Sequence, residues 1–152
     1  MVVQQVVRVR DFKPEDMERV LEIEHESFKD PYPRSLLEHI HNLHPDGFMI
    51  AEINDEIVGY IIGVMRWGGT GHVLAVAVSP PYRRRGVGKS LMVNMMDRLQ
   101  RKGASRIRIE VRASNTVAQS FYQKLNFRQR RIVPSYYSDG EAAILMQYTF
   151  SD

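Results

Sequence analysis

The stretch "VSPPYRRRGVGKSLM", Val78 to Met92, decides the fold, because in it a basic, glycine-containing turn joins an apolar run to a helix-forming segment. A Walker A motif needs a glycine five positions before the Gly-Lys pair, and Arg83 occupies that position. The dinucleotide fingerprint fails at its third glycine, where Leu91 stands. Three arginines and two glycines that open a helix instead predict phosphate or pyrophosphate binding by backbone N–H groups. The alternative is a short glycine turn with solvated arginines.

Composition indicates one ordinary globular domain over residues 1–152, with 43% hydrophobic and 26% charged residues. No apolar run is long enough to span a membrane, and no leader pattern opens the chain, so we expect a cytoplasmic protein. The absence of cysteine excludes disulfides, zinc thiolates and cysteine catalysis. The net charge of +3 fits an anionic cofactor and does not by itself predict binding to nucleic acid.

Hydrophobic periodicity predicts alternating strands and helices of an α/β domain. We expect strands at 2–9, 48–53, 57–66, 72–79, 106–112, 127–133 and 142–150. We expect helices that begin near Lys13, at Ser35, at Gly86 and at Ser114 or Asn115. The strand at 72–79 is continuously apolar, as expected of a strand buried on both faces. It should lie parallel to the strand at 106–112, so that the sheet changes from antiparallel to parallel in its middle.

Two motifs carry a resemblance to a known family. The pattern [QR]-x-x-G-x-[GA] is matched by Arg83, Gly86 and Gly88. About 30 residues further on, as strand–helix units require, a second block contains Asn115, Ala118, Phe121, Tyr122, Leu125 and Phe127. The sequence resembles the GNAT N-acetyltransferases, and among them the RimI-type and archaeal protein N-terminal acetyltransferases. The resemblance implies the GNAT fold, a mixed seven-stranded sheet flanked by about four helices.

The co-substrate that the resemblance implies is acetyl-CoA, with no metal. Its pyrophosphate would be held by backbone N–H groups of Arg84, Arg85, Gly86, Val87, Gly88 and Lys89, with the side chains of Arg83 to Arg85 nearby. Val76 and Val78 would offer backbone groups to the pantetheine arm, as an added strand does. Asn115 would hydrogen-bond this arm. Tyr122 would place its hydroxyl by the thioester sulfur and protonate the leaving thiolate, although periodicity alone makes Tyr122 a core aromatic.

The candidate general bases are Glu110 and His72, which could flank one cleft if their strands are neighbours. The alternatives are an ion pair of Glu110 with Arg108 or Arg112, and a structural role for His72. A peptide would enter between the segments 27–33 and 134–141. Tyr136 and Tyr137 would bind its backbone, and the first-residue pocket would be shaped by Phe28, Asp30, Pro31 and Tyr32. Otherwise both segments are ordinary turns.

The resemblance therefore implies an N-α-acetyltransferase that moves acetyl from acetyl-CoA to the free N-terminal amine of proteins or peptides by direct attack. Ribosomal proteins are among the acceptors that it implies, and an auxiliary subunit among the partners. One alternative is acetylation of a lysine side chain or a small-molecule amine. A second is a non-catalytic acyl-CoA-binding subunit.

Overall fold

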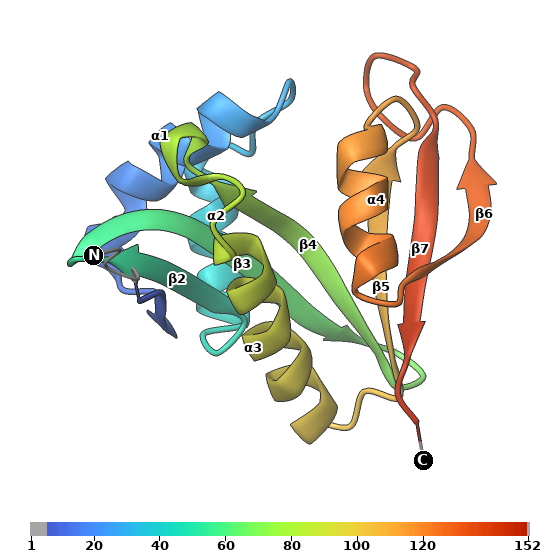
Figure 1. The fold of residues 1–152 in the computed structure, drawn as a ribbon, viewed down its shortest axis with the longest axis horizontal. Coiled ribbons are helices and arrows are strands. Elements are labelled where there is room, and N and C mark those ends of the chain that lie inside the picture. Colours follow the sequence, from blue (N-terminus) through green and yellow to red (C-terminus); the bar gives the residue numbers. More distant parts are fainter. Residues whose placement is uncertain (1–5, 152) are drawn as a thin grey trace, which may run out of the picture.

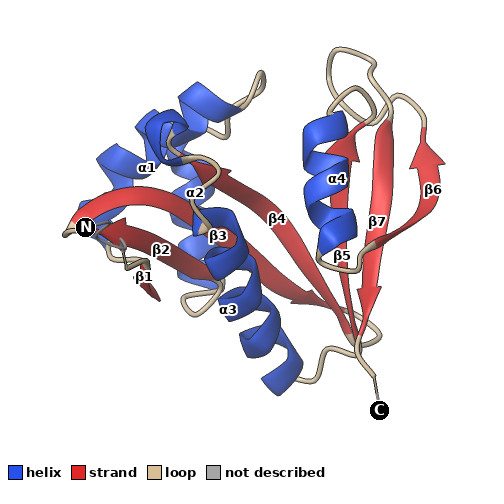
Figure 2. Ribbon diagram, in the orientation of Figure 1, coloured by secondary structure: helices blue, strands red, loops and turns tan. Residues whose placement is uncertain are grey.

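The computed structural model describes residues 6–151, which form one seven-stranded sheet in the order β1-β2-β3-β4-β5-β7-β6 (Figure 1 and Figure 2). The strands are β1 Arg8–Asp11, β2 Phe48–Ile53, β3 Glu56–Arg66, β4 Thr70–Val78, β5 Arg106–Arg112, β6 Arg128–Val133 and β7 Ala143–Thr149. The helices are α1 Met17–Ser27, α2 Arg34–Leu43, α3 Val87–Arg101 and α4 Thr116–Lys124, with 3₁₀ turns at Pro14–Asp16 and Pro80–Tyr82. The predicted mixed α/β sheet is confirmed.

The parallel pair β4–β5 is short, and this positions the site. Its pairing covers only Thr70–His72 with Arg106–Arg108, after which the two strands diverge in a V (Figure 1). A bulge in β4 accompanies the divergence: Ile62 pairs with Ala75 but Gly63 with Val73, so Leu74 is an extra residue on β4. A bulge bends the strand that carries it and increases its twist. The second half of β4 therefore presents an edge that β5 does not cover.

Two apolar cores lie on opposite faces of the sheet. The helices α3 and α4 pack over one face, with Leu91, Met95 and Tyr122 in the same cluster as Ile109 of β5. The helices α1 and α2 cover the other face over β2 to β4, where Ile23 and Leu37 join Tyr60 and Ile62. The strands β5, β7 and β6 thus carry helix α4 on one face, and Figure 2 draws no helix behind them.

The structure corrects two expectations. The first strand was predicted at 2–9, but β1 is Arg8–Asp11, because it pairs with β2 from Arg8↔Glu52 to Asp11↔Met49; residues 2–5 lie outside the described part. Burial of β4 on both faces was wrong for its second half, where Leu74, Val76 and Val78 are partly exposed. They are exposed because β5 has diverged from β4 at that point. Within residues 6–151, none of the helices is long and apolar enough to cross a membrane.

Candidate active site

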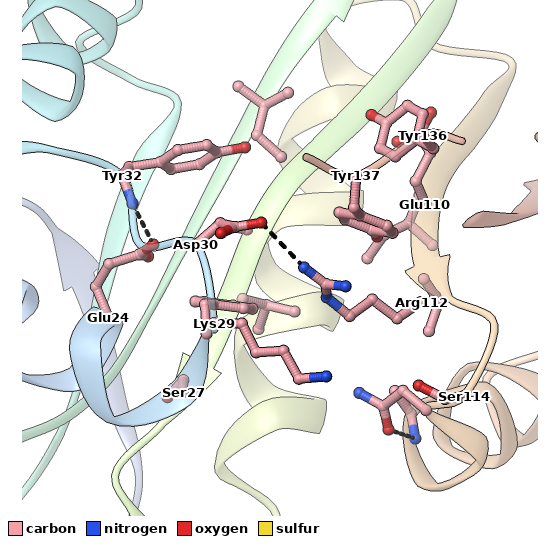
Figure 3. Close-up of a pocket in the computed structure, with 18 of the residues that line it drawn as sticks. Glu24, Ser27, Lys29, Asp30, Tyr32, Glu110, Arg112, Ser114, Tyr136 and Tyr137 are labelled. Atoms are coloured by element: carbon pink, nitrogen blue, oxygen red, sulfur yellow. Dashed lines mark hydrogen bonds and ion pairs between the residues drawn. The ribbon is translucent and has the colours of Figure 1, made fainter. Parts of the chain in front are cut away.

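A cavity of about 760 Å³ lies between the diverging strands β4 and β5. Its walls come from the middle of β4, the end of β5, the start of α4, the α1–α2 loop and the β6–β7 loop (Figure 3). The two loops are separated by about a hundred residues of sequence, yet both reach this opening. The size suits a small-molecule or cofactor site, for which cavities of about 300–1,000 Å³ are usual.

Nine of the candidate residues meet at this cavity. It is lined by Phe28, Asp30, Tyr32, Val76, Glu110, Asn115, Tyr122, Tyr136 and Tyr137. Its lining does not include Pro31, His72, Val78 or the residues Arg83 to Lys89, which precede and begin α3. His72 is nevertheless in direct contact with Glu110, and the segment Arg83 to Lys89 is joined to the end of β4 by the 3₁₀ turn Pro80–Tyr82.

Glu110 and His72 form a nearly buried pair. Glu110 Oε2 lies 2.6 Å from His72 Nε2, and the two side chains are 10% and 6% exposed. The other ring nitrogen, Nδ1, accepts hydrogen bonds of 3.2 Å from Arg66 Nε and Arg108 Nη2. Because arginine only donates, Nδ1 must be the acceptor and Nε2 carries the hydrogen. His72 is therefore a neutral donor to Glu110 in this arrangement.

The surroundings of Glu110 keep it ionised. Burial acts to raise its pKa, but the hydrogen bond from His72 and the positive charge of Arg108 together outweigh burial, so the pKa lies below its usual value. Arg108 Nε lies 2.9 Å from Glu110 Oε1, although this N–H is not aligned for a hydrogen bond. The result is a carboxylate at neutral pH that faces the cavity.

Tyr122 combines a buried ring with a hydroxyl at the cavity. The residue is 6% exposed, and its ring packs edge-to-face against Phe121 and Phe127, with ring centroids 5.1 Å and 5.7 Å away. Burial, with a smaller contribution from Tyr137, raises the pKa of Tyr122, so the hydroxyl stays protonated. Within residues 6–151 no protein group forms a hydrogen bond with this hydroxyl. It is available to a ligand as a donor.

The start of α3 offers unpaired backbone donors. Its first intrahelical bond joins Ser90 N–H to the Gly86 carbonyl, so the N–H groups of Val87, Gly88 and Lys89 have no partner within the helix. Gly86 has φ +81°, a conformation that favours glycine. Gly88 lies close to α4, since a Cβ there would be 3.3 Å from the Phe121 ring. These features fit an anion held against the backbone.

The rest of the cavity fits a pantetheine arm. Beyond His72 the β4 edge has no pairing with β5, which leaves it open to an added extended segment. Asn115 caps α4 by accepting a 3.0 Å hydrogen bond from Ala118 N–H through Oδ1. Its amide NH₂ is directed away from this bond and can donate to a ligand. The described residues 6–151 contain no cluster of His, Asp or Glu side chains arranged to hold a metal ion.

Asp30 and Arg112 join the two loops across the cavity mouth (Figure 3). Arg112 Nη2 lies 3.1 Å from Asp30 Oδ2, which also accepts a 2.7 Å hydrogen bond from Ser138. The same guanidinium is paired with Asp139 at 2.9 Å and lies over the Tyr137 ring, 4.1 Å from its centroid. The α1–α2 loop is thereby tied to β5 and to the β6–β7 loop.

Sequence reasoning missed Glu24 and the central position of Arg112. Glu24 is 1% exposed, borders the cavity, and accepts hydrogen bonds from the Tyr60 hydroxyl and, at 2.8 Å, from Tyr32 N–H. The sequence did contain a signal for Glu24, because this residue lies three residues after Leu21 and seven after Met17, on the buried side of α1. A carboxylate buried there needs hydrogen-bond partners. Arg112 gave no such signal, because its partners come from distant loops.

Comparison with known proteins decides the family. The profile described as the acetyltransferase (GNAT) family matches residues 17–127. The chain belongs to the GNAT acetyltransferase family. It is 41% identical over 139 residues to an uncharacterized N-acetyltransferase of Methanocaldococcus jannaschii, covering 91% of this chain and 88% of that protein. It is 32% identical over 152 residues to an N-alpha-acetyltransferase of Sulfurisphaera tokodaii, covering 91% and 90%.

The fold agrees with this assignment. The crystal structure of Ard1 from Thermoplasma volcanium has a TM-score of 0.91 and 31% identity, covering 96% of this chain and 99% of that one. As a GNAT acetyltransferase, the chain is an acyltransferase whose acetyl donor is acetyl-CoA.

Proposed function

We propose that the chain acetylates the free N-terminal amine of polypeptides. The observation that carries this proposal is that one cavity brings together the Glu110 carboxylate, the Tyr122 hydroxyl and both loops that can hold a peptide. The similarity to an N-alpha-acetyltransferase over nine-tenths of both chains supports it. The site residues predicted from the sequence keep their roles in this proposal as predictions.

Acetyl-CoA supplies an activated acetyl thioester. We assign its pyrophosphate to the α3 start with Arg83 to Arg85, and its pantetheine arm to the β4 edge at Val76 and Val78. The nitrogen lone pair of the neutral acceptor amine attacks the carbonyl carbon, the C–N bond forms and the C–S bond breaks. Glu110 takes the proton that the amine loses, directly or through water, and Tyr122 gives a proton to the leaving thiolate. His72 holds Glu110 in place through its Nε2–H.

The weak basicity of Glu110 favours an α-amine over lysine. An α-amine has a pKa of about 7.7–8.0, against about 10.4 for lysine. Because of this difference of roughly 2.5 units, deprotonation to the neutral, nucleophilic form costs about 3.4 kcal/mol less for the α-amine than for lysine. A carboxylate whose pKa is lowered by its partners is a poor match for the more basic amine. The only carboxylate of the α1–α2 loop at the mouth, Asp30, is already paired with Arg112.

The test is acetyl transfer to short peptides that vary in their first two residues, with products identified by mass spectrometry. Peptides from the N-termini of ribosomal proteins belong in the panel, and a lysine-containing peptide with a blocked terminus is the control. We expect acetylation of free termini and none of the control. Acetylation of the control alone would replace the proposal with lysine chemistry. Binding of acetyl-CoA without transfer to any peptide or amine would indicate a non-catalytic subunit.

A further inference from the structure

One face of the strands β5, β7 and β6 is rich in arginine. Ile107, Ile109 and Val111 of β5 pack in the core on the α4 side, so the alternate residues of β5 point to the opposite face. Cross-strand partners share a face, which places Gln147 beside Arg108, Arg128 beside Gln147, and Arg131 beside Leu145. The arginine face consists of Arg66, Arg106, Arg108, Arg128 and Arg131.

The positive charge on this face is hardly compensated. Arg108 is paired with Glu110, whereas Arg66 donates to His72 and Arg106 donates to the Gly68 carbonyl and the Ser105 hydroxyl. Among the residues that the structure describes, no carboxylate lies within ion-pair distance of Arg66, Arg106, Arg128 or Arg131. Both Arg128 and Arg131 are exposed. A face of this kind attracts anionic partners.

The arginine face is continuous with the acceptor site. Glu110, which borders the cavity, lies on the same face of β5 as Arg106 and Arg108. The four residues from Glu110 to Arg106 span about 13 Å at about 3.3 Å per residue. A polypeptide whose first residue lies at Glu110, and which leaves extended along this face, would therefore bring roughly its residue 3 past Arg108 and its residue 5 past Arg106.

We propose that the arginine face binds an acidic segment of the acceptor polypeptide, a few residues after its N-terminus; this proposal rests on the proposed function. Guanidinium groups bind carboxylates through paired, charge-assisted hydrogen bonds. Protection of an edge strand against aggregation would explain the arginines of β6. It does not explain Arg66, Arg106 and Arg108, which stand on interior strands of the sheet.

The test compares three peptides with the same first two residues and with Asp/Glu, Asn/Gln or Lys at residues 3 to 5. Binding is measured by fluorescence anisotropy of peptides labelled at their C-termini, at low and moderate salt. We expect the acidic peptide to bind about tenfold more tightly than the neutral one at low salt, with a smaller ratio at moderate salt. Arg128→Gln/Arg131→Gln and, separately, Arg106→Gln should reduce this ratio severalfold. Arg101→Gln/Lys124→Gln, which removes equal charge from α3 and α4, should not.

Three results would overturn the inference. The first is equal binding of the acidic and neutral peptides. The second is an equal loss of the acidic preference in the control variant Arg101→Gln/Lys124→Gln. The third is tighter binding of a single-stranded RNA oligonucleotide than of the acidic peptide, if the same arginine variants abolish it. Acetyl transfer to the neutral peptide separates this inference from the proposed function. Transfer to the neutral peptide without any acidic preference would leave the function intact and refute the arginine face. Acidic binding that needs the arginines, without transfer to any peptide, would support the arginine face and refute the function.

Discussion

Replacing Tyr122 with phenylalanine removes a single hydroxyl group from the proposed site. The phenylalanine ring keeps the edge-to-face contacts with Phe121 and Phe127. The hydroxyl has no protein partner within residues 6–151, so no buried group loses a hydrogen bond. We therefore expect the free energy of unfolding to change by less than about 1 kcal/mol. Acetyl-CoA binding should be equally unaffected.

Turnover should fall by much more. A positioned general acid contributes about 10²–10⁴-fold, and a thiolate is already a fair leaving group without protonation. We therefore expect a loss near the lower limit, about a hundredfold in kcat, which corresponds to about 2.7 kcal/mol of activation free energy. Burial raises the pKa of Tyr122, so the loss should persist across the neutral pH range.

The assay measures kcat and KM for a free-terminus peptide, together with thermal unfolding with and without acetyl-CoA. Tyr148→Phe is the matched control, because the Tyr148 ring packs against Phe127 and edge-to-face against Phe150 but does not line the cavity. A kcat for Tyr122→Phe within threefold of the wild-type value would remove Tyr122 from the chemistry. Loss of the stabilisation by acetyl-CoA would instead make Tyr122 a binding residue.

Further predictions concern the charged groups around the cavity. Because the pKa of Glu110 is lowered, Glu110 is already ionised at the pH where the peptide α-amine titrates. The acidic limb of the pH profile of kcat/KM should therefore have its midpoint at the pKa of the peptide α-amine, about 7.7–8.0. The same midpoint for peptides with different α-amine pKa values would contradict this. Asp30→Asn weakens the contact with Arg112, and it should raise the KM for the peptide about two- to fivefold while the KM for acetyl-CoA stays unchanged. Steady-state kinetics would measure both constants, with Asp97→Asn, which weakens the contact of Asp97 with Arg101, as the control. Burial raises the pKa of Glu24 despite its bonds to two tyrosines, so its protonated form contributes stability that is lost as the pH rises through the folded-state pKa. The stability of the wild type relative to Glu24→Gln should therefore fall in urea unfolding as the pH rises above about 4.3, the ordinary pKa of glutamate, and a rise would show the opposite pKa shift.

The paired loops give the site a mouth that depends on tertiary contacts. Asp30, Arg112 and Ser138 come from three different segments, and their bonds hold the α1–α2 loop against the β6–β7 loop. Glu24 of α1 holds the same α1–α2 loop by accepting a hydrogen bond from the Tyr32 N–H. The shape of the acceptor pocket thus rests on two carboxylates with different environments, one exposed and one buried.

The local chain by itself was sufficient to predict the strand–turn–helix order and to propose a donor site at the start of the helix. Glycines and arginines at the start of a helix act through neighbouring backbone groups, so their spacing could be read without knowledge of the fold. Tyr122 was different, because its place on an apolar stripe is equally typical of a core residue. The family motif, and not periodicity, indicated its role.

Tertiary structure alone decided how the acceptor side is built. The bulge at Leu74 and the three-residue pairing of β4 with β5 set the width of the cavity, and neither follows from alternation of apolar residues. The contact of Glu110 with His72, and the two arginines that fix the His72 tautomer, join strands that are far apart in sequence. Local sequence determined which elements form, because propensity, capping and burial act over a few residues. The distances between the elements determined the chemistry, because hydrogen bonds and ion pairs require atoms within about 3–4 Å of one another.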